Sequence, residues 1–451
     1  MPTRREFLSL ATGATFGTAL PWPARAQMFS AGADQEAARR RADLIDRLTA
    51  LSAFGRPSPG TFESGVSRVA YSDADLEGRR YVLALLREQA HLQPRIDPAG
   101  NIFARREGTV PSLAPIVFGS HIDSVPNGGN FDGTLGSLAA IGVIEALDRR
   151  HVRTRHPLEI VIWAHEEGVA YAHGVAGSRI VAGDIRPADL EQVWNGLRRA
   201  DAIRRIGGDP DRIAEARREK GSIAAYFELH IEQGARLEEA HVPIGVVQAI
   251  VAVHRHEVVV TGFANHAGTT PMDRRQDALV AASALTLAVR DIVTSEPGTQ
   301  VGTVGRLEVA PNAPNVIPGE VRLTIELRDV SADTLRRLAE AIRARARQIA
   351  ADSKTAIAMR LASENPPASA DAALQDLVAA AGGRLGLASM RLPSMAGHDA
   401  QMMAQIGPMA MIFVPSLGGI SHSPHERTSW DDCARGADVL VETVVAADRQ
   451  L

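Results

Sequence analysis

The chain has 451 residues, of which 45% are hydrophobic, 23% charged and 4% aromatic, with a formal net charge of −4. This length exceeds one ordinary hydrophobic core, so we expect two domains, and the composition excludes a disordered or fibrous protein. Without a basic stripe or many stacking rings, the sequence indicates no nucleic-acid partner. The single cysteine, Cys433, excludes an internal disulfide and a cysteine-rich zinc site, so any metal must be bound by histidine and carboxylate side chains.

The amino terminus has the features of an export signal. Arg4 and Arg5 precede a modest apolar stretch, and Ala24 and Ala26 are small residues at the −3 and −1 positions of a cleavage site. We expect residues 1–27 to be a twin-arginine signal peptide and the mature protein to be periplasmic. The alternative is an arginine pair on a short amphipathic helix. No later apolar run is long enough to span a bilayer, so no membrane partner is expected after signal removal.

The first metal-binding candidates follow a predicted buried strand at residues 114–118, after predicted helices at 33–51 and 73–89 and a strand with a turn at 95–104. The glycine-rich turn that comes next contains His121, Asp123 and Asp132. His121 and Asp132 suit a divalent metal, and Asp123 can orient His121 from behind. A polar loop with one structural histidine explains this short motif equally well.

Two more strand ends carry similar groups. A helix is predicted at 136–149, and the buried strand at 158–164 ends near Glu166 and Glu167. Adjacent carboxylates are costly unless a cation or a proton lies between them, although a solvated acidic turn is the alternative. The run 224–234 adds His230. Other segments before residue 252 are predicted as helix (178–192), charged surface helix (195–220) and strand (244–251).

From residue 252 to residue 364 the order of elements changes. Strands are predicted at 255–263, 301–309, 320–328 and 355–361, and helices at 273–294 and 332–352. This β-α-β-β-α-β order is typical of a ferredoxin-like α+β unit. It divides a larger α/β domain into two parts, residues 28–251 and 365–451.

Four loops, each after an apolar run, supply three histidines and three carboxylates: His121 with Asp132, Glu166 with Glu167, His230, and His422. This set can ligate two divalent ions and leave one carboxylate as a general base. Zn²⁺ or Mn²⁺ is expected, with Co²⁺ or Ni²⁺ as further candidates. A lone histidine is usually structural, but three at the ends of strand-like runs with acids beside them favour a metal site.

Seven motifs give a resemblance to a known family. They are Gly-Ser-His-Ile-Asp-Ser-Val-Pro-Asn-Gly-Gly-Asn-Phe-Asp-Gly at 119–133, Glu-Glu-Gly at 166–168, Glu-Leu-His-Ile-Glu-Gln-Gly at 228–234, His-Ala-Gly-Thr-Thr-Pro-Met at 266–272, Asn-Val-Ile-Pro-Gly-Glu at 315–320, Ala-Gly-His-Asp-Ala at 396–400 and Ser-His-Ser-Pro-His-Glu at 421–426. From about residue 40 onward the chain resembles the hydantoinase/carbamoylase branch of the M20 metallopeptidase-like amidohydrolases. This branch holds N-carbamoyl-L-amino acid hydrolases, allantoate amidohydrolases and β-ureidopropionases.

The resemblance implies an α/β fold in which a mixed-sheet, zinc-peptidase-like catalytic domain carries the α+β unit as a lid that also forms a homodimer. It further implies two divalent ions per subunit. Its residue assignments make Asp132 the bridging ligand, His121 and His230 ligands of one ion, Glu167 and His422 ligands of the other, and Glu166 the general base. His425 lies at a variable position of its motif and is not assigned.

The resemblance also implies the substrate contacts. His266 would stabilise the oxyanion, in its own subunit or in the partner. Asn315 and Arg328 would hold the substrate carboxylate, while Gln233 and the backbone near Gly397 would bind the ureido or carboxylate end. Without the family, Arg328 is equally well a surface cation. For His266 the alternative is a turn-capping residue, but a functional role is favoured.

The expected activity is hydrolysis of the C–N bond of a small ureido or amide substrate with a free carboxylate, such as an N-carbamoyl-L-amino acid, allantoate or ureidopropionate. Hydrolysis of N-acyl-amino acids or dipeptides by the same metal chemistry is the alternative. His165, Tyr171 and Met395 depart from the pattern of the branch beside the substrate pocket, so they bear on substrate identity.

Overall fold

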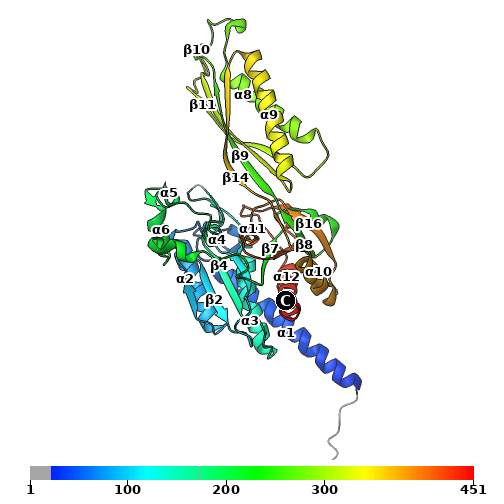
Figure 1. The fold of residues 1–451 in the computed structure, drawn as a ribbon. Coiled ribbons are helices and arrows are strands. Elements are labelled where there is room, and N and C mark those ends of the chain that lie inside the picture. The colour runs from blue at the N-terminus through cyan, green and yellow to red at the C-terminus, as the bar shows by residue number, and fades with distance from the viewer. Residues whose placement is uncertain (1–21, 172) are drawn as a thin grey trace, which may run out of the picture.

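The computed structural model describes residues 22–171 and 173–451 (Figure 1). The predicted twin-arginine motif therefore lies outside the described residues. The first helix, α1 (Trp22–Leu51), begins earlier than the predicted residue 33, because Pro23 in a first turn does not disrupt a helix. No helix in the described ranges is both long and apolar enough to cross a membrane.

A mixed sheet of nine strands forms the centre of the larger unit. Its order is β1-β2-β4-β3-β7-β17-β8-β15, with β16 also paired to β8. The neighbours β4, β3, β7 and β17 are parallel, so their carboxyl ends meet at one edge, and their near-continuous apolar runs are buried. The bounds are β1 (Pro94–Ile96), β2 (Ile102–Arg106), β3 (Ile116–His121), β4 (Leu158–Trp163), β7 (Ala225–Ile231), β8 (Ile244–Ile250), β15 (Ala368–Ser369), β16 (Ser389–Ser394) and β17 (Met409–Val414).

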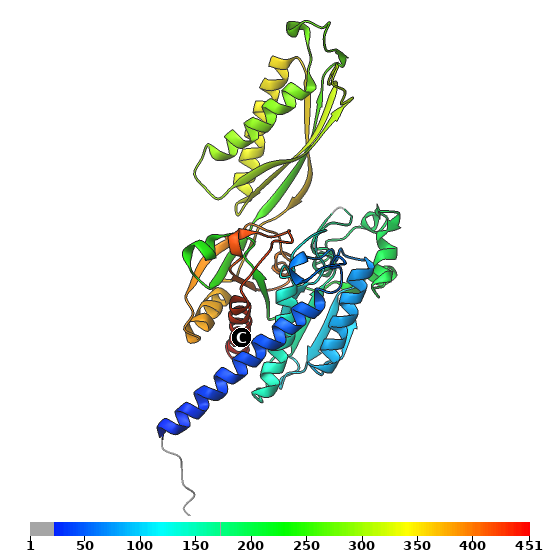
Figure 2. The ribbon, with the colours of Figure 1, turned by 180° about the vertical axis from the view of Figure 1, so that it is seen from behind.

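Helices cover both faces of this sheet. On one face, α1 contacts α3 (Thr134–Arg149) and α12 (Trp430–Gln450), and α12 contacts α10 (Ala372–Arg384) (Figure 2). The apolar core beneath them includes the fully buried Cys433. On the other face, α4 (Ala176–Val181) and α11 (Asp399–Met403) cover a second apolar cluster. The helix α2 (Asp73–Glu88) is capped by Ser72 as predicted.

The inserted unit has its own four-stranded antiparallel sheet, in the order β11-β13-β9-β14. Two helices pack on one face of this sheet, as expected for a ferredoxin-like unit. Figure 1 shows the unit standing away from the larger one, with β9 and β14 leading back to it. The predicted fold class is confirmed. The bounds are β9 (Ala252–Thr261), α8 (Ala278–Thr294), β11 (Val301–Ala310), β13 (Glu320–Asp329), α9 (Ala332–Ser353) and β14 (Ala356–Asn365). A separate two-stranded antiparallel sheet is formed by β10 (Asn265–His266) and β12 (Val316–Ile317).

Two predicted helices are wrong. The helix predicted at 178–192 stops at Val181, and only the short α5 (Pro187–Leu190) follows, because Gly183 has a φ of 84° and Pro187 starts a new helix. The helix predicted at 195–220 is instead a hairpin of β5 (Val193–Trp194) and β6 (Leu197–Arg198), then α6 (Arg199–Arg205) and a 3-10 helix (Pro210–Ala216). The Asn195-Gly196 pair, at φ 48° and 76°, is the turn signal that the charge pattern obscured.

Candidate metal centre

The candidate ligands lie at the carboxyl edge of the parallel strands, where open α/β sheets place their functional groups. His121 ends β3, Glu166 and Glu167 follow β4, and His230 lies near the end of β7. Asp132 precedes α3 in the glycine-rich turn. The fold therefore brings together side chains that are far apart in the sequence.

Asp132 lies between two groups of ligand atoms. Its Oδ1 is 3.5 Å from Nε2 of His121 and 3.2 Å from Nε2 of His230. Its Oδ2 is 3.4 Å from Nε2 of His422, which is 3.2 Å from Oε2 of Glu167. Each group of three has its ligand atoms within 4.8 Å of one another.

These distances fit metal coordination. Ligands about 2.0–2.1 Å from a tetrahedral ion lie about 3.3 Å from one another. The measured separations of 3.2–3.5 Å bracket that value. The donor chemistry also fits, since imidazole and carboxylate together suit Zn²⁺ and its first-row neighbours.

Main-chain carbonyls fix the orientation of two imidazoles. Nδ1 of His121 donates to the carbonyl of Asp123 at 3.0 Å, and Nδ1 of His230 donates to the carbonyl of Ile231 at 2.9 Å. The carbonyls can only accept, so in the neutral form of each ring Nε2 is left as the acceptor that faces the centre. Asp123 thus orients His121 chiefly through its backbone, because its carboxylate lies 3.7 Å from Nδ1. That carboxylate instead accepts the N–H groups of Glu166 and Glu167, at 3.1 and 3.2 Å.

The electrostatics of the centre are those of crowded, buried carboxylates. Burial raises the pKa of Glu166 well above its usual range against the effect of His121, and Asp399 raises it further. Burial, with the charge of Asp132, raises the pKa of Glu167 to about 8. For His121, burial lowers the pKa, but Glu166 and the neighbouring aspartates outweigh it and raise the value. A divalent cation would relieve this repulsion between carboxylates.

An outer layer supports Asp132. Gln233, expected at the substrate, donates from Nε2 to Oδ2 of Asp132 at 2.6 Å. The Ser421 hydroxyl lies 3.0 Å from the same oxygen and 2.8 Å from Oε2 of Glu426. Glu426 accepts the N–H groups of Phe131 and Asp132. The sequence interpretation missed Ser421 and Glu426, although both lie in the motif that supplied His422.

A second supporting layer lies beneath His230. The ring of His398 packs 4.5 Å from the ring of His230, and its Nε2 lies 2.8 Å from the Ser394 hydroxyl. The buried carboxylate of Glu228 accepts from Ser120 at 2.8 Å and from the N–H of Ala400 at 3.0 Å. Glu228, His230 and His398 are close enough to form a third donor set, but these bonds already occupy Glu228 and His398. Both were missed as site residues, although they belong to the motifs at 228–234 and 396–400.

The ligands line a cavity of about 200 Å³, which also contains Arg328, Gly397 and Arg255. A second cavity of about 430 Å³ adjoins it and shares Gln233, Arg328 and His422. Three of the expected substrate residues, Gln233, Arg328 and Gly397, therefore lie at the centre.

His266 and Asn315 do not. His266 lies in β10 and Asn315 directly before β12, in the small two-stranded sheet at the far end of the inserted unit (Figure 1). The N–H of Ala267 donates to the carbonyl of Asn315 there at 3.0 Å. The exposed ring of His266 accepts the N–H groups of Gly268 and Thr269 through Nδ1. Within one chain these residues do not join the ligands.

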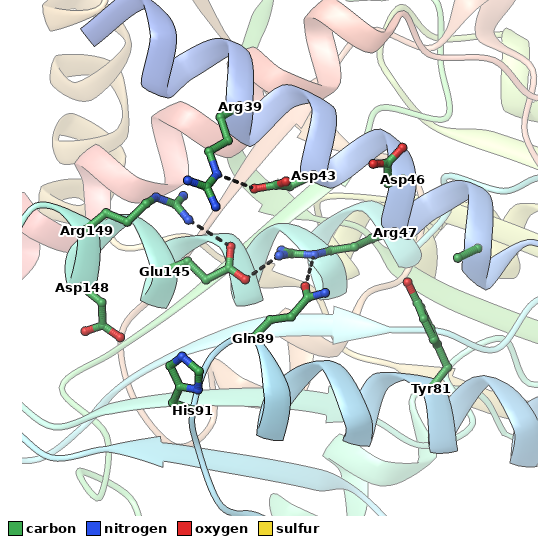
Figure 3. Close-up of a pocket in the computed structure, with 11 residues that line it drawn as sticks. Arg39, Asp43, Asp46, Arg47, Tyr81, Gln89, His91, Glu145, Asp148 and Arg149 are labelled. Carbon is green, nitrogen blue, oxygen red and sulfur yellow. Dashed lines mark hydrogen bonds and ion pairs between the residues drawn. The ribbon is translucent and has the colours of Figure 1, made fainter. Parts of the chain in front are cut away.

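A larger cavity, of about 610 Å³, lies at the other end of α3 (Figure 3). Arg47 and Arg149 both pair with Glu145 there, and Arg39 lies 3.8 Å from Asp43. These charges largely satisfy one another, and none of the three metal-donor sets found among the described residues lies there.

The pattern of peptidase family M20/M25/M40 matches residues 117–446. The chain is 39% identical over 402 residues to the N-carbamoyl-L-amino acid amidohydrolase of Geobacillus stearothermophilus, covering 89% of this chain and 97% of that protein. The chain belongs to the M20 family. It is 37% identical to the ureidoglycolate hydrolase of Arabidopsis thaliana, covering 89% of this chain and 85% of that one. A hydantoinase/carbamoylase family amidase of Burkholderia vietnamiensis has a similar structure, with a TM-score of 0.80, 36% identity, and coverage of 90% of this chain and 97% of that one.

Membership of the hydantoinase/carbamoylase branch of M20 is thereby confirmed. This M20 protein is a hydrolase of non-peptide C–N bonds. Its histidine and carboxylate clusters are candidate metal sites of the kind that the sequence predicted.

Proposed function

We propose that this M20 hydrolase binds two divalent metal ions and cleaves the ureido C–N bond of N-carbamoyl-L-amino acids or related ureido acids. The observation that carries the proposal is the placement of Asp132, whose two oxygens face different histidine-containing donor sets. The names of its relatives support the substrate class, because they act on carbamoyl and ureido compounds.

His121, Asp132 and His230 would hold one ion, and Asp132, Glu167 and His422 the other. When bound, the ions lower the pKa of a water and polarise the substrate carbonyl. Glu166 belongs to neither donor set, and its Oε2 lies 3.7 Å from Nε2 of His121. It accepts a proton from the attacking water and delivers it to the leaving amine, a role that a carboxyl group of raised pKa suits. The released carbamate would decompose to CO₂ and ammonia.

Arg328 holds the substrate carboxylate, since it lines both cavities. In a homodimer built through the inserted unit, His266 of a second copy reaches the centre and stabilises the oxyanion. Asn315 of that copy helps Arg328 to hold the substrate carboxylate. The exposure of both residues at the tip of that unit supports this arrangement, since neither contacts the centre of its own chain. Export by the twin-arginine route would place this dimer in the periplasm.

The test is release of ammonia by protein reconstituted separately with Zn²⁺, Mn²⁺, Co²⁺ and Ni²⁺. The substrates are N-carbamoyl-L-amino acids, allantoate and ureidopropionate, and Glu166→Gln is the blank. Absence of ammonia with every metal and substrate contradicts the proposal. The peptidase family pattern favours one alternative, hydrolysis of N-acyl-amino acids or dipeptides, which would release an amine without ammonia.

A further inference from the structure

The cavity of about 430 Å³ beside the metal centre is lined by two arginines, Arg236 and Arg328, and by one acidic side chain, Glu232. Arg236, at the start of α7 (Arg236–Ala240), lines it with an exposed side chain. In the described part of the chain its guanidinium has no ion-pair or hydrogen-bond partner, and only its backbone N–H is engaged, by Glu232. An unpaired guanidinium at a cavity wall is a ready partner for a carboxylate.

The one acidic side chain of this cavity is already engaged. The buried carboxylate of Glu232 accepts the N–H of Arg236 at 2.9 Å and the N–H of Leu237 at 2.8 Å. It therefore caps the start of α7 and is not aimed at the guanidinium of Arg236. The cavity keeps a net attraction for an anion.

Two further arginines strengthen that attraction. Arg328 lines both cavities, and Arg255 lines the cavity of the metal centre. Both pair with the same carboxylate, Glu326, at 2.7 and 2.5 Å. One glutamate thus offsets two arginines, so with Arg236 and Glu232 included three positive charges face two negative ones.

We propose that the substrate carries two carboxylates and is an N-carbamoyl derivative of an acidic amino acid. This inference rests on the proposed function. One carboxylate binds Arg328, which both cavities share, while the ureido group lies at the metal ligands. The side chain then extends into the neighbouring cavity, where its carboxylate meets Arg236. An uncharged side chain would leave that guanidinium unpaired.

The test compares isosteric substrates that differ only in charge: N-carbamoyl-L-glutamate with N-carbamoyl-L-glutamine, and N-carbamoyl-L-aspartate with N-carbamoyl-L-asparagine. We expect kcat/KM for the acidic member to be about tenfold higher. Arg236→Gln should remove most of this ratio, and Arg236→Lys should retain part of it. Arg212→Gln, which removes an exposed arginine outside both cavities, is the matched control. Equal rates for the two members, or a ratio that Arg236→Gln leaves unchanged, overturn the inference.

A binding measurement separates this inference from the proposed function. Zinc-loaded wild-type protein should bind succinate about tenfold more tightly than butyrate, and Arg236→Gln should abolish the difference. If no ureido compound yields ammonia but this difference is seen, the proposed reaction is wrong and the two-carboxylate site stands. If succinate and butyrate bind equally, or neither binds, the inference is overturned.

Discussion

The side-chain amide of Gln233 donates a 2.6 Å hydrogen bond to Oδ2 of Asp132. Asp132 is the only residue shared by the two donor sets at the centre of the proposed site. Its orientation therefore affects both sets at once, and the amide of Gln233 is part of what fixes it.

Replacing this amide should weaken metal binding. In Gln233→Met, Asp132 loses a hydrogen bond and some restraint on its rotation, and we expect metal affinity to fall about 10–100-fold. Competition with a chromophoric chelator measures the change. Gln348→Met, on the exposed surface of α9, is the control and should bind metal like wild type. Wild-type affinity in Gln233→Met would contradict the support assigned to this bond.

Substitutions of the two adjacent glutamates, Glu166 and Glu167, should have different effects on activity and metal content. Glu166→Gln removes the proton acceptor but no ligand, so activity should fall about 10²–10⁴-fold while the metal content stays near wild type. Glu167→Gln alters a donor set directly and should lower the metal content itself. Elemental analysis together with the ammonia assay distinguishes the two variants. Metal loss in Glu166→Gln would place Glu166 among the ligands.

Gly133 leaves no room for a side chain. Its φ is 65°, and a Cβ there would lie 2.3 Å from Nε2 of His121. Gly133→Ala should therefore displace this imidazole and abolish metal binding and activity. Gly221→Ala is a matched control, because its φ is 84° but no heavy atom lies within 4 Å of the added Cβ. It should show only the backbone strain, about 1 kcal/mol, as a slightly lower melting temperature.

His256 should make the inserted unit sensitive to acid. Burial, with the charges of Arg343 and His254, lowers the pKa of His256 to about 4. The unfolded chain, whose histidine titrates near 6.5, binds more protons between pH 6.5 and pH 4, so the folded state loses stability as the pH falls through that interval. Melting temperatures of wild type and His256→Leu, measured from pH 7.5 to pH 4, test this. The variant should show the smaller decrease, and parallel curves would contradict the prediction.

Mixing two inactive variants tests the assignment of His266 to the partner. Glu166→Gln and His266→Ala protomers, exchanged at random, should form mixed dimers in which one of two sites is complete, and recover about a quarter of wild-type activity. Recovery of no activity, with subunit exchange verified independently, would mean that both residues act within one chain. Wild-type activity of His266→Ala alone would mean that His266 has no catalytic role.

The ends of the strands were predictable because buried parallel strands are continuous apolar runs. His121, Glu166 and Glu167 lie where these runs end. The ferredoxin-like unit was predictable from the order of its elements. The structure of the segment 195–220 was not predictable, because its many charges are typical of an exposed helix. The turn at Asn195-Gly196 breaks that helix, but its signal is only two residues long.

Within the site, residue type predicted the ligands better than their supports. Histidines and acids at strand ends are conspicuous in a sequence. Ser421 and Glu426 are not, because their role follows from the path of the chain around Asp132. Similarly, the main-chain carbonyl of Asp123 orients His121, and no side-chain pattern reveals a carbonyl.

The chain has one thiol, that of Cys433, which lies on the buried face of α12. Burial raises its pKa, so the reactive thiolate is scarce while the core is closed. The inserted unit has no cysteine. The rate of alkylation of native protein by a thiol reagent should therefore report opening of the catalytic unit alone. Unfolding confined to β9–β14 would leave that rate unchanged, which provides a way to follow the two units separately without labelling or mutation.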